Sequence, residues 1–116
     1  LFDIGADLCK PYKEENIKRF EKPVFFLENE LDKLNEKLDE LSSFILPGGT
    51  NASAYLHLSR AIVRRAERSI IDLLEKEKVN PTLLEYINRL SDFLFVAARF
   101  ENREVGDILW TPDKKG

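Results

Sequence analysis

The stretch that decides the fold is residues 79–100, VNPTLLEYINRLSDFLFVAARF. Asn80 is a good helix N-cap, Pro81 suits the first helical position, and Val79 and Leu84 have the spacing of a hydrophobic staple. Apolar residues then recur with helical spacing and cover more than one side of the predicted helix: Leu83, Leu84, Ile87, Leu90, Phe93, Leu94, Phe95, Val96 and Ala98. This pattern predicts a helix that is central in a helical bundle.

Two further helices are predicted upstream. Over 23–41, five leucines recur at steps of four and three and form one apolar stripe: Leu27, Leu31, Leu34, Leu38 and Leu41. Over 52–77, a predicted buried seam contains Leu56, Val63, Ile70 and Leu74, and is widened by Leu58, Ile62, Ala66 and Leu73. Pro47-Gly48-Gly49 indicates a turn between the two helices, and Thr50 or Asn51 can cap the second.

The remaining segments complete the predicted architecture. Residues 1–9 read as the end of another helix, 10–20 as a polar connection with one helical turn, and 107–116 as a peripheral or frayed tail. No stretch alternates like a strand. We therefore predict an all-α, up-and-down helical bundle of at least four helices in a single domain, 1–116. The chain has no methionine and begins inside an apolar pattern, so we expect that the first part of the bundle is missing.

Composition excludes several classes of protein. The 116 residues carry 18 Lys and Arg against 21 Asp and Glu, and this net charge of -3 argues against binding of nucleic acid by a bulk positive field. A single cysteine, Cys9, can form neither an intramolecular disulfide nor a cysteine-rich zinc site. No apolar run approaches the roughly 18 residues that a membrane span needs. We expect a cytoplasmic protein without a membrane segment, with organellar targeting left open.

The sequence also lacks the common catalytic motifs. His57 is the only histidine, and no Glu-x-x-His motif is present, which argues against a di-iron centre. Neither standard glycine-rich phosphate loop occurs. We interpret His57 as a hydrogen-bonded packing residue on a long helix rather than a metal ligand.

Arginine placement is the most informative polar feature. Four of the eight arginines fall within nine residues, and Arg60, Arg64 and Arg68 are spaced i, i+4, i+8. Like charges one turn apart repel unless an anion lies among them, and guanidinium groups bind phosphate oxygens in bidentate fashion. The row therefore suits a polyphosphate, but a solvated helix face that pairs with neighbouring acids explains it as well.

Two other features are compatible with a ligand. The apolar run Phe44-Ile45-Leu46 precedes the Pro-Gly-Gly turn, where a polar loop would be usual, so it either plugs the end of the core or meets a large apolar partner. A polar cluster interrupts the apolar helix over 80–100 and must be hydrogen-bonded, either to the arginine row or to a nucleotide: Asn88, Arg89, Ser91 and Asp92.

Three stretches together resemble the PduO-type ATP:cob(I)alamin adenosyltransferases. They are FILPGGT at 44–50, AYLHLSRAIVRRAER at 54–68 and YINRLSDFLF at 86–95, and the opening LFDIGADL at 1–8 is similar as well. The resemblance runs from Leu1 to about Arg99. It implies a five-helix bundle that assembles as a homotrimer, with ATP and the corrinoid bound between adjacent subunits. The implied reaction moves the 5′-deoxyadenosyl group of ATP to cob(I)alamin and releases triphosphate, usually with Mg²⁺.

The resemblance also implies roles for individual residues. ATP contacts fall on Arg64, Arg65, Ala66, Glu67, Arg68 and Asn88. Phe44 matches the aromatic residue that occupies the lower face of the corrin and displaces its axial base, and Arg60 matches an arginine that pairs with an acid in the N-terminal part of the family. Arg60, Arg64 and Glu67 are thus the expected catalytic residues, with no metal ligand among them.

One departure from the family pattern bears on this interpretation. The family's N-terminal phosphate-binding stretch, of the Thr-Lys-Thr-Gly-Asp type, does not occur in these 116 residues, and neither does the acidic partner expected for Arg60. The alternative function is a non-catalytic helical oligomerisation or interaction module with a structural arginine row. An RNA-binding helix is disfavoured by the net charge.

Overall fold

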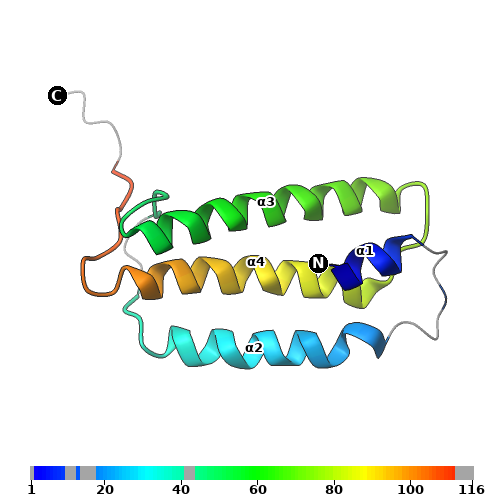
Figure 1. Cartoon of the computed structure of the whole chain (residues 1–116), viewed down its shortest axis with the longest axis horizontal. Coiled ribbons are helices and arrows are strands. Elements are labelled where there is room, and N and C mark those ends of the chain that lie inside the picture. Colours follow the sequence, from blue (N-terminus) through cyan, green and yellow to red (C-terminus); the bar gives the residue numbers. More distant parts are fainter. Residues whose placement is uncertain (1, 10–12, 14–17, 41–43, 112–116) are drawn as a thin grey trace.

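The computed structural model describes residues 2–9, 13, 18–40 and 44–111, with the side chain of Phe2 left aside. Four α-helices, shown in Figure 1, contain most of these residues: α1 (Phe2–Leu8), α2 (Glu21–Asn35), α3 (Asn51–Leu74) and α4 (Pro81–Glu101). The described residues otherwise contain one isolated antiparallel bridge, between Ile45 and Leu109. The all-α prediction is confirmed. The predictions for Leu1, for Leu41 and for most of 10–20 lie outside the described residues, although 18–20 do form a short 3₁₀ turn.

Helix α4 is central, as its sequence predicts. It packs against α3 on one flank and α2 on the other, and Figure 1 shows it lying between them. The Asn80 side chain accepts a hydrogen bond of 3.1 Å from the backbone N–H of Thr82, which confirms the predicted N-cap. Leu83 and Ile87 are fully buried because the helix has neighbours on both sides.

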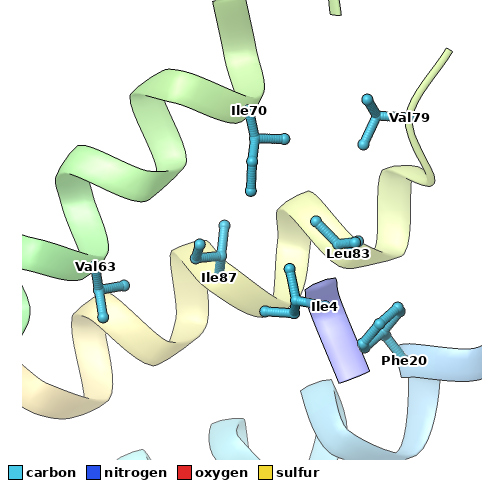
Figure 2. Packing of buried hydrophobic residues seen from close by; sticks show 7 residues of the cluster. All are labelled: Ile4, Phe20, Val63, Ile70, Val79, Leu83 and Ile87. Atoms are coloured by element: carbon cyan, nitrogen blue, oxygen red, sulfur yellow. The ribbon is translucent and has the colours of Figure 1, made fainter. Parts of the chain in front are cut away.

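The hydrophobic core joins one end of the three long helices to α1. Figure 2 shows its buried members converging from four parts of the chain: Ile4, Phe20, Val63, Ile70, Val79, Leu83 and Ile87. Leu84 packs against this cluster together with Val79, as the predicted staple requires. The ring of Phe20 also lies 5.9 Å from that of Tyr86 on α4. Helix α1 is thus fixed across α4 by Ile4.

Helices α2 and α3 are both shorter at their C-terminal ends than predicted. Helix α2 stops at Asn35, six residues before the predicted end, and Leu38 lies in the turn that follows. Arg99 accounts for this, because its Nη2 donates a 2.6 Å hydrogen bond to the Asp39 carbonyl and holds that segment outside the helix. Helix α3 ends at Leu74 rather than Glu77, in a turn whose hydrogen bonds tighten to i→i+3.

The predicted seam of α3 is only partly correct. Val63 and Ile70 are buried, and Leu56 and Ala66 are half-buried, as expected. Four residues predicted to lie in the seam or widen it are instead exposed: Leu58, Ile62, Leu73 and Leu74. The three long helices lie side by side, so the side of α3 away from α4 has no covering element among the described residues.

No helix in the described part of the chain is both long and apolar enough to cross a membrane. The longest, α3, carries four arginines within its middle turns. The thiol of Cys9 is exposed and free.

Candidate functional site

The predicted arginine row lies on α3 and faces solvent over most of its length. Arg64, Arg65 and Arg68 are exposed, whereas Arg60 is half-buried. Within the described ranges, none of the three exposed guanidinium groups forms an ion pair with a carboxylate. The explanation that the row is neutralised by neighbouring acids is therefore not supported for these three residues, and the surface is locally cationic on a chain of net charge -3.

A chain of hydrogen bonds crosses the three long helices beside this row. Asn88 Nδ2 on α4 donates to Glu67 Oε2 on α3 at 3.0 Å, and Asn88 Oδ1 accepts from Arg89 Nη1 at 2.8 Å. Arg89 Nε continues to Glu28 Oε1 on α2 at 3.1 Å. The polar cluster of α4 thus bonds to α3 and α2, and it fixes the Glu67 carboxylate among the arginines.

Arg60 differs from the rest of the row. Its guanidinium lies over the Phe95 ring on α4, with 4.9 Å from its central carbon to the ring centroid. Burial lowers the pKa of Arg60, Arg64 lowers it further, and Asp92 opposes both. Its Nε is buried without a hydrogen-bond partner among the described residues. The acid predicted to pair with Arg60 is not found within those residues.

His57 packs as predicted, one turn before Arg60. It is buried, and its ring meets Phe95 edge-on at 6.3 Å between centroids. Burial lowers the pKa of His57, Asp107 raises it, and Arg60 lowers it. His57 is thus a packing residue, as predicted. The predicted hydrogen bond is not found, because Nε2 has no partner among the described residues. The described residues contain no group of three or more His, Cys, Asp or Glu side chains that could hold a metal ion.

Phe44 projects from the loop between α2 and α3. Its side chain is 79% exposed, and its one ring contact among the described residues is an edge-on approach to Trp110 at 6.1 Å. Plugging of the bundle core, one of the two predicted roles, is therefore wrong for Phe44. The loop backbone is well fixed, since Leu46 N–H donates to the Ile108 carbonyl and Trp110 N–H to the Phe44 carbonyl, each at 2.7 Å.

A buried polar network behind this loop was missed from the sequence. Asn102 caps the C-terminus of α4 and bonds to Thr50 N–H and to the Gly48 carbonyl, both at 2.9 Å. Arg99 Nε donates to Asp107 Oδ2 at 3.2 Å. Part of the tail predicted to be peripheral or frayed is therefore held in place: residues 107–110 pair with the loop, while 112–116 lie outside the described residues.

The structure brings some of the predicted site residues together and leaves others apart. Arg60, Arg64, Arg65, Ala66, Glu67 and Arg68 all lie on α3, and Glu67 bonds directly to Asn88. The side chain of Ala66 packs against the core cluster. Phe44 lies before the N-terminus of α3, and at 1.5 Å per residue Arg64 is roughly 20 Å further along that helix. A ligand that contacts both must bridge this span or meet residues of a second chain.

Comparison with known proteins matches these residues to one family. A family model described as cobalamin adenosyltransferase matches residues 1–101. The chain is 43% identical over 110 residues to the corrinoid adenosyltransferase of Bacillus subtilis, covering 93% of this chain and 57% of that protein. It is 38% identical over 112 residues to the corrinoid adenosyltransferase MMAB of Mus musculus, covering 91% and 47%.

A solved structure gives the same result. A phenylalanine-to-alanine variant of a PduO-type ATP:corrinoid adenosyltransferase from Lactobacillus reuteri, complexed with cobalamin and ATP, superposes with a TM-score of 0.83 at 40% identity. The match covers 94% of this chain and 63% of that one. The chain thus spans between about half and two thirds of the length of these relatives.

Proposed function

The chain belongs to the cobalamin adenosyltransferase family, and from this premise we propose that it transfers the 5′-deoxyadenosyl group of ATP to cob(I)alamin. The observation that carries the proposal is the exposed row of Arg64, Arg65 and Arg68, which has no carboxylate partner within the described ranges. Unpaired, closely spaced guanidinium groups are suited to a polyphosphate.

In this proposal the arginine row binds the triphosphate of ATP. Arg64 and Arg68 lie one turn apart, so an anion between them removes their mutual repulsion. Glu67 and Asn88, joined by their 3.0 Å hydrogen bond, form the fixed edge against which ATP is oriented. Arg65 and Ala66 complete the assigned contact surface, Ala66 through its backbone, since its side chain packs against the core.

Phe44 is proposed to bind the lower face of the corrinoid. An exposed phenyl ring on a fixed backbone can occupy the axial position of cobalt and exclude both the axial base and water. Removal of that base favours the cobalt(I) state. The 79% exposure of the ring supports this role better than a role in packing.

The chemistry makes few demands on the protein. Cobalt(I) is the nucleophile; its electron pair forms the bond to carbon 5′ of ATP, and triphosphate leaves with the electron pair of the carbon–oxygen bond that breaks. The protein must align the two substrates and stabilise the charge on the leaving triphosphate, which Arg64 can do. Arg60 is held over Phe95 beside Arg64 and adds to the same positive field.

Mg²⁺ and a homotrimer complete the proposal. The described residues hold no cluster of metal ligands, so we assign Mg²⁺ no protein ligand and propose that it accompanies the phosphates of ATP. An exposed apolar stripe on α3 supports contact with another copy of the chain: Tyr55, Leu58 and Ile62. In a site between subunits, Phe44 of one subunit and the arginine row of its neighbour could contact the same pair of substrates, although the two lie far apart within one chain. A cytoplasmic location stays a prediction.

The test is formation of adenosylcobalamin by the full gene product that contains this chain. The protein is mixed with ATP and chemically reduced cobalamin, and the absorbance change that marks adenosylcobalamin is followed with time. Turnover that saturates in both substrates supports the proposal. If there is no turnover while the protein remains helical and sediments as a trimer, the alternative, a non-catalytic helical interaction module, is correct.

A further inference from the structure

One buried amide, that of Asn102, bonds to the loop that carries Phe44 in addition to the backbone hydrogen bonds described above. Asn102 is 1% exposed, and its side chain is engaged on both polar atoms. Oδ1 accepts from Thr50 N–H, and Nδ2 donates to the Gly48 carbonyl, both at 2.9 Å, so the amide spans the loop on either side of Gly49. The backbone carbonyl of Asn102 also accepts a 2.6 Å hydrogen bond from Gly106 N–H.

The same residue links the loop to the segment that follows α4. Asn102 Nδ2 lies 3.5 Å from Asp107 Oδ1, and the other carboxylate oxygen of Asp107 accepts from Arg99. The next residues, Ile108 and Trp110, then pair with the loop backbone on both sides of Ile45. Asn102 and Asp107 therefore connect the Phe44 loop to the segment that follows α4. At the exposed end of these paired segments, the Phe44 ring meets Trp110 edge-on. Figure 1 shows the two segments meeting beside the start of α3.

Gly49 shows how closely the amide fits its loop. Its φ is +101°, a conformation that favours glycine, and a Cβ there would lie 2.6 Å from Cγ of Asn102. The loop thus passes directly over the amide, with no room for a side chain. Thr50, the next residue, is the N-cap of α3 through a 3.1 Å bond from Ser53 N–H to its Oγ1. The position of Asn102 is thereby coupled to the start of the helix that carries the arginine row.

We propose that Asn102 is a positioning residue for the corrinoid step, which fixes the Phe44 ring by holding both sides of its loop. Only 1% of Asn102 is exposed and both polar atoms of its side chain are hydrogen-bonded within the protein, so we assign its effect to the positions of Phe44 and Trp110. The part of the proposal that concerns the corrinoid rests on the proposed adenosyltransferase function. The part that concerns loop geometry does not.

The test compares Asn102→Ala with Asn35→Ala, which removes an exposed asparagine from the last position of α2. Trp110 is the only tryptophan, so its fluorescence reports on the Phe44 contact without any substrate. We expect Asn102→Ala to shift the Trp110 emission to longer wavelength and to speed amide exchange at Leu46 and Thr50. Asn35→Ala should do neither.

Kinetics then separates a positioning role from a general structural one. For Asn102→Ala we expect the KM for cob(I)alamin to rise about tenfold, equivalent to about 1.4 kcal/mol, while the KM for ATP changes less than about twofold. Asn102→Asp keeps the acceptor for Thr50 N–H but sets a carboxylate oxygen against the Gly48 carbonyl and the Asp107 carboxylate, so its effect should be at least as large as that of Asn102→Ala. If Asn102→Ala does not fold, Asn102→Ser is measured in its place and should move every readout in the same direction.

Two results would overturn the proposal. One is an unchanged Trp110 emission and unchanged amide exchange in the folded variant, which would show that Asn102 does not fix the loop. The other is an equal rise of both KM values, which would show a general structural role. If the unsubstituted protein fails to adenosylate cobalamin, the proposed function fails, and the fluorescence and exchange measurements still decide whether Asn102 positions Phe44.

Discussion

The two polar regions of this molecule are built on opposite principles. On α3, Arg64, Arg65 and Arg68 are exposed and have no carboxylate partner in the described part of the chain. At the other end, Asn102 is buried, and each polar atom of its side chain is hydrogen-bonded. A group that must bind a ligand has to keep its hydrogen-bonding capacity free, whereas a group that positions a loop must use it within the protein.

The comparison distinguishes what a substitution should do in each region. Removing one of these arginines should cost function and little stability, because no ion pair among the described residues is lost. Removing a saturated buried amide should cost structure first, and function through it. The two regions are linked through Thr50. Its backbone N–H donates to Asn102, and its side chain caps α3, the helix on which the arginines lie.

The largest effect is expected from Arg64→Ala. Loss of one charged donor to the leaving triphosphate should lower kcat/KM for ATP by about 100-fold or more, at an almost unchanged melting temperature. Lys78→Ala, which removes another exposed positive charge, between α3 and α4, is the control and should leave both quantities unchanged. A collapse of the melting temperature in Arg64→Ala would remove the distinction between the two regions.

Next is Gly49→Ala, which tests how tightly the loop is seated. The strained positive φ and the clash with the Asn102 amide should together lower the free energy of unfolding by about 1–3 kcal/mol. Gly5→Ala is the matched control, because a Cβ at Gly5 in α1 meets nothing within 4 Å, and alanine favours the helix. Urea denaturation measures both. Equal stability of the two variants would contradict the fit described for Gly49.

Phe44→Ala should separate the loop's exposed tip from its buried support. The side chain is mostly exposed, so folding and the KM for ATP should be almost unchanged, while the base-off form of bound cobalamin should be less populated, by a factor of about ten. The absorbance and paramagnetic resonance spectra of bound cobalt(II) report this population. Cobalt spectra identical to those of the unsubstituted protein would exclude Phe44 from the corrinoid face.

The smallest effect is expected from His57, which lies between the regions. Burial lowers its pKa below the ordinary value near 6.5, so the unfolded chain takes up a proton there before the folded chain does. The free energy of unfolding should therefore fall as pH drops from about 7.5 to about 5.5. Replacement by phenylalanine, His57→Phe, keeps the ring contact with Phe95 and should flatten this slope in thermal melts. An unaltered slope would assign it to other groups.

The sequence predicted the helices from signals that are local. Asn80 and Pro81 mark the start of α4 because capping involves only nearby backbone groups, and the predicted cap is present at 3.1 Å. The ends of α2 and the exposure of Leu58 and Ile62 could not be predicted in the same way. They depend on which other element lies alongside, and a periodic apolar pattern does not reveal whether its outer face is covered.

The candidate site also contains residues that local sequence indicates and residues whose role depends on distant segments. Four arginines within nine residues and an apolar run before a Pro-Gly-Gly turn are both unusual in a sequence, so the arginine row and Phe44 could be singled out. Asn102 is an ordinary asparagine at a helix end, and Asp107 lies in a tail that carries no pattern. Their bonds to Gly48, Thr50 and Arg99 join segments up to 54 residues apart, so no local pattern in the sequence indicates them.

The central place of α4 has a consequence for how the molecule opens. Helices α2 and α3 make their main contacts with α4 and hardly any with each other. A fluctuation that detaches either flanking helix therefore leaves the other in place, whereas loss of α4 releases both at once. Local unfolding should accordingly proceed from the flanks inward, and the amide protons around Leu83 and Ile87 should be the last to exchange with solvent.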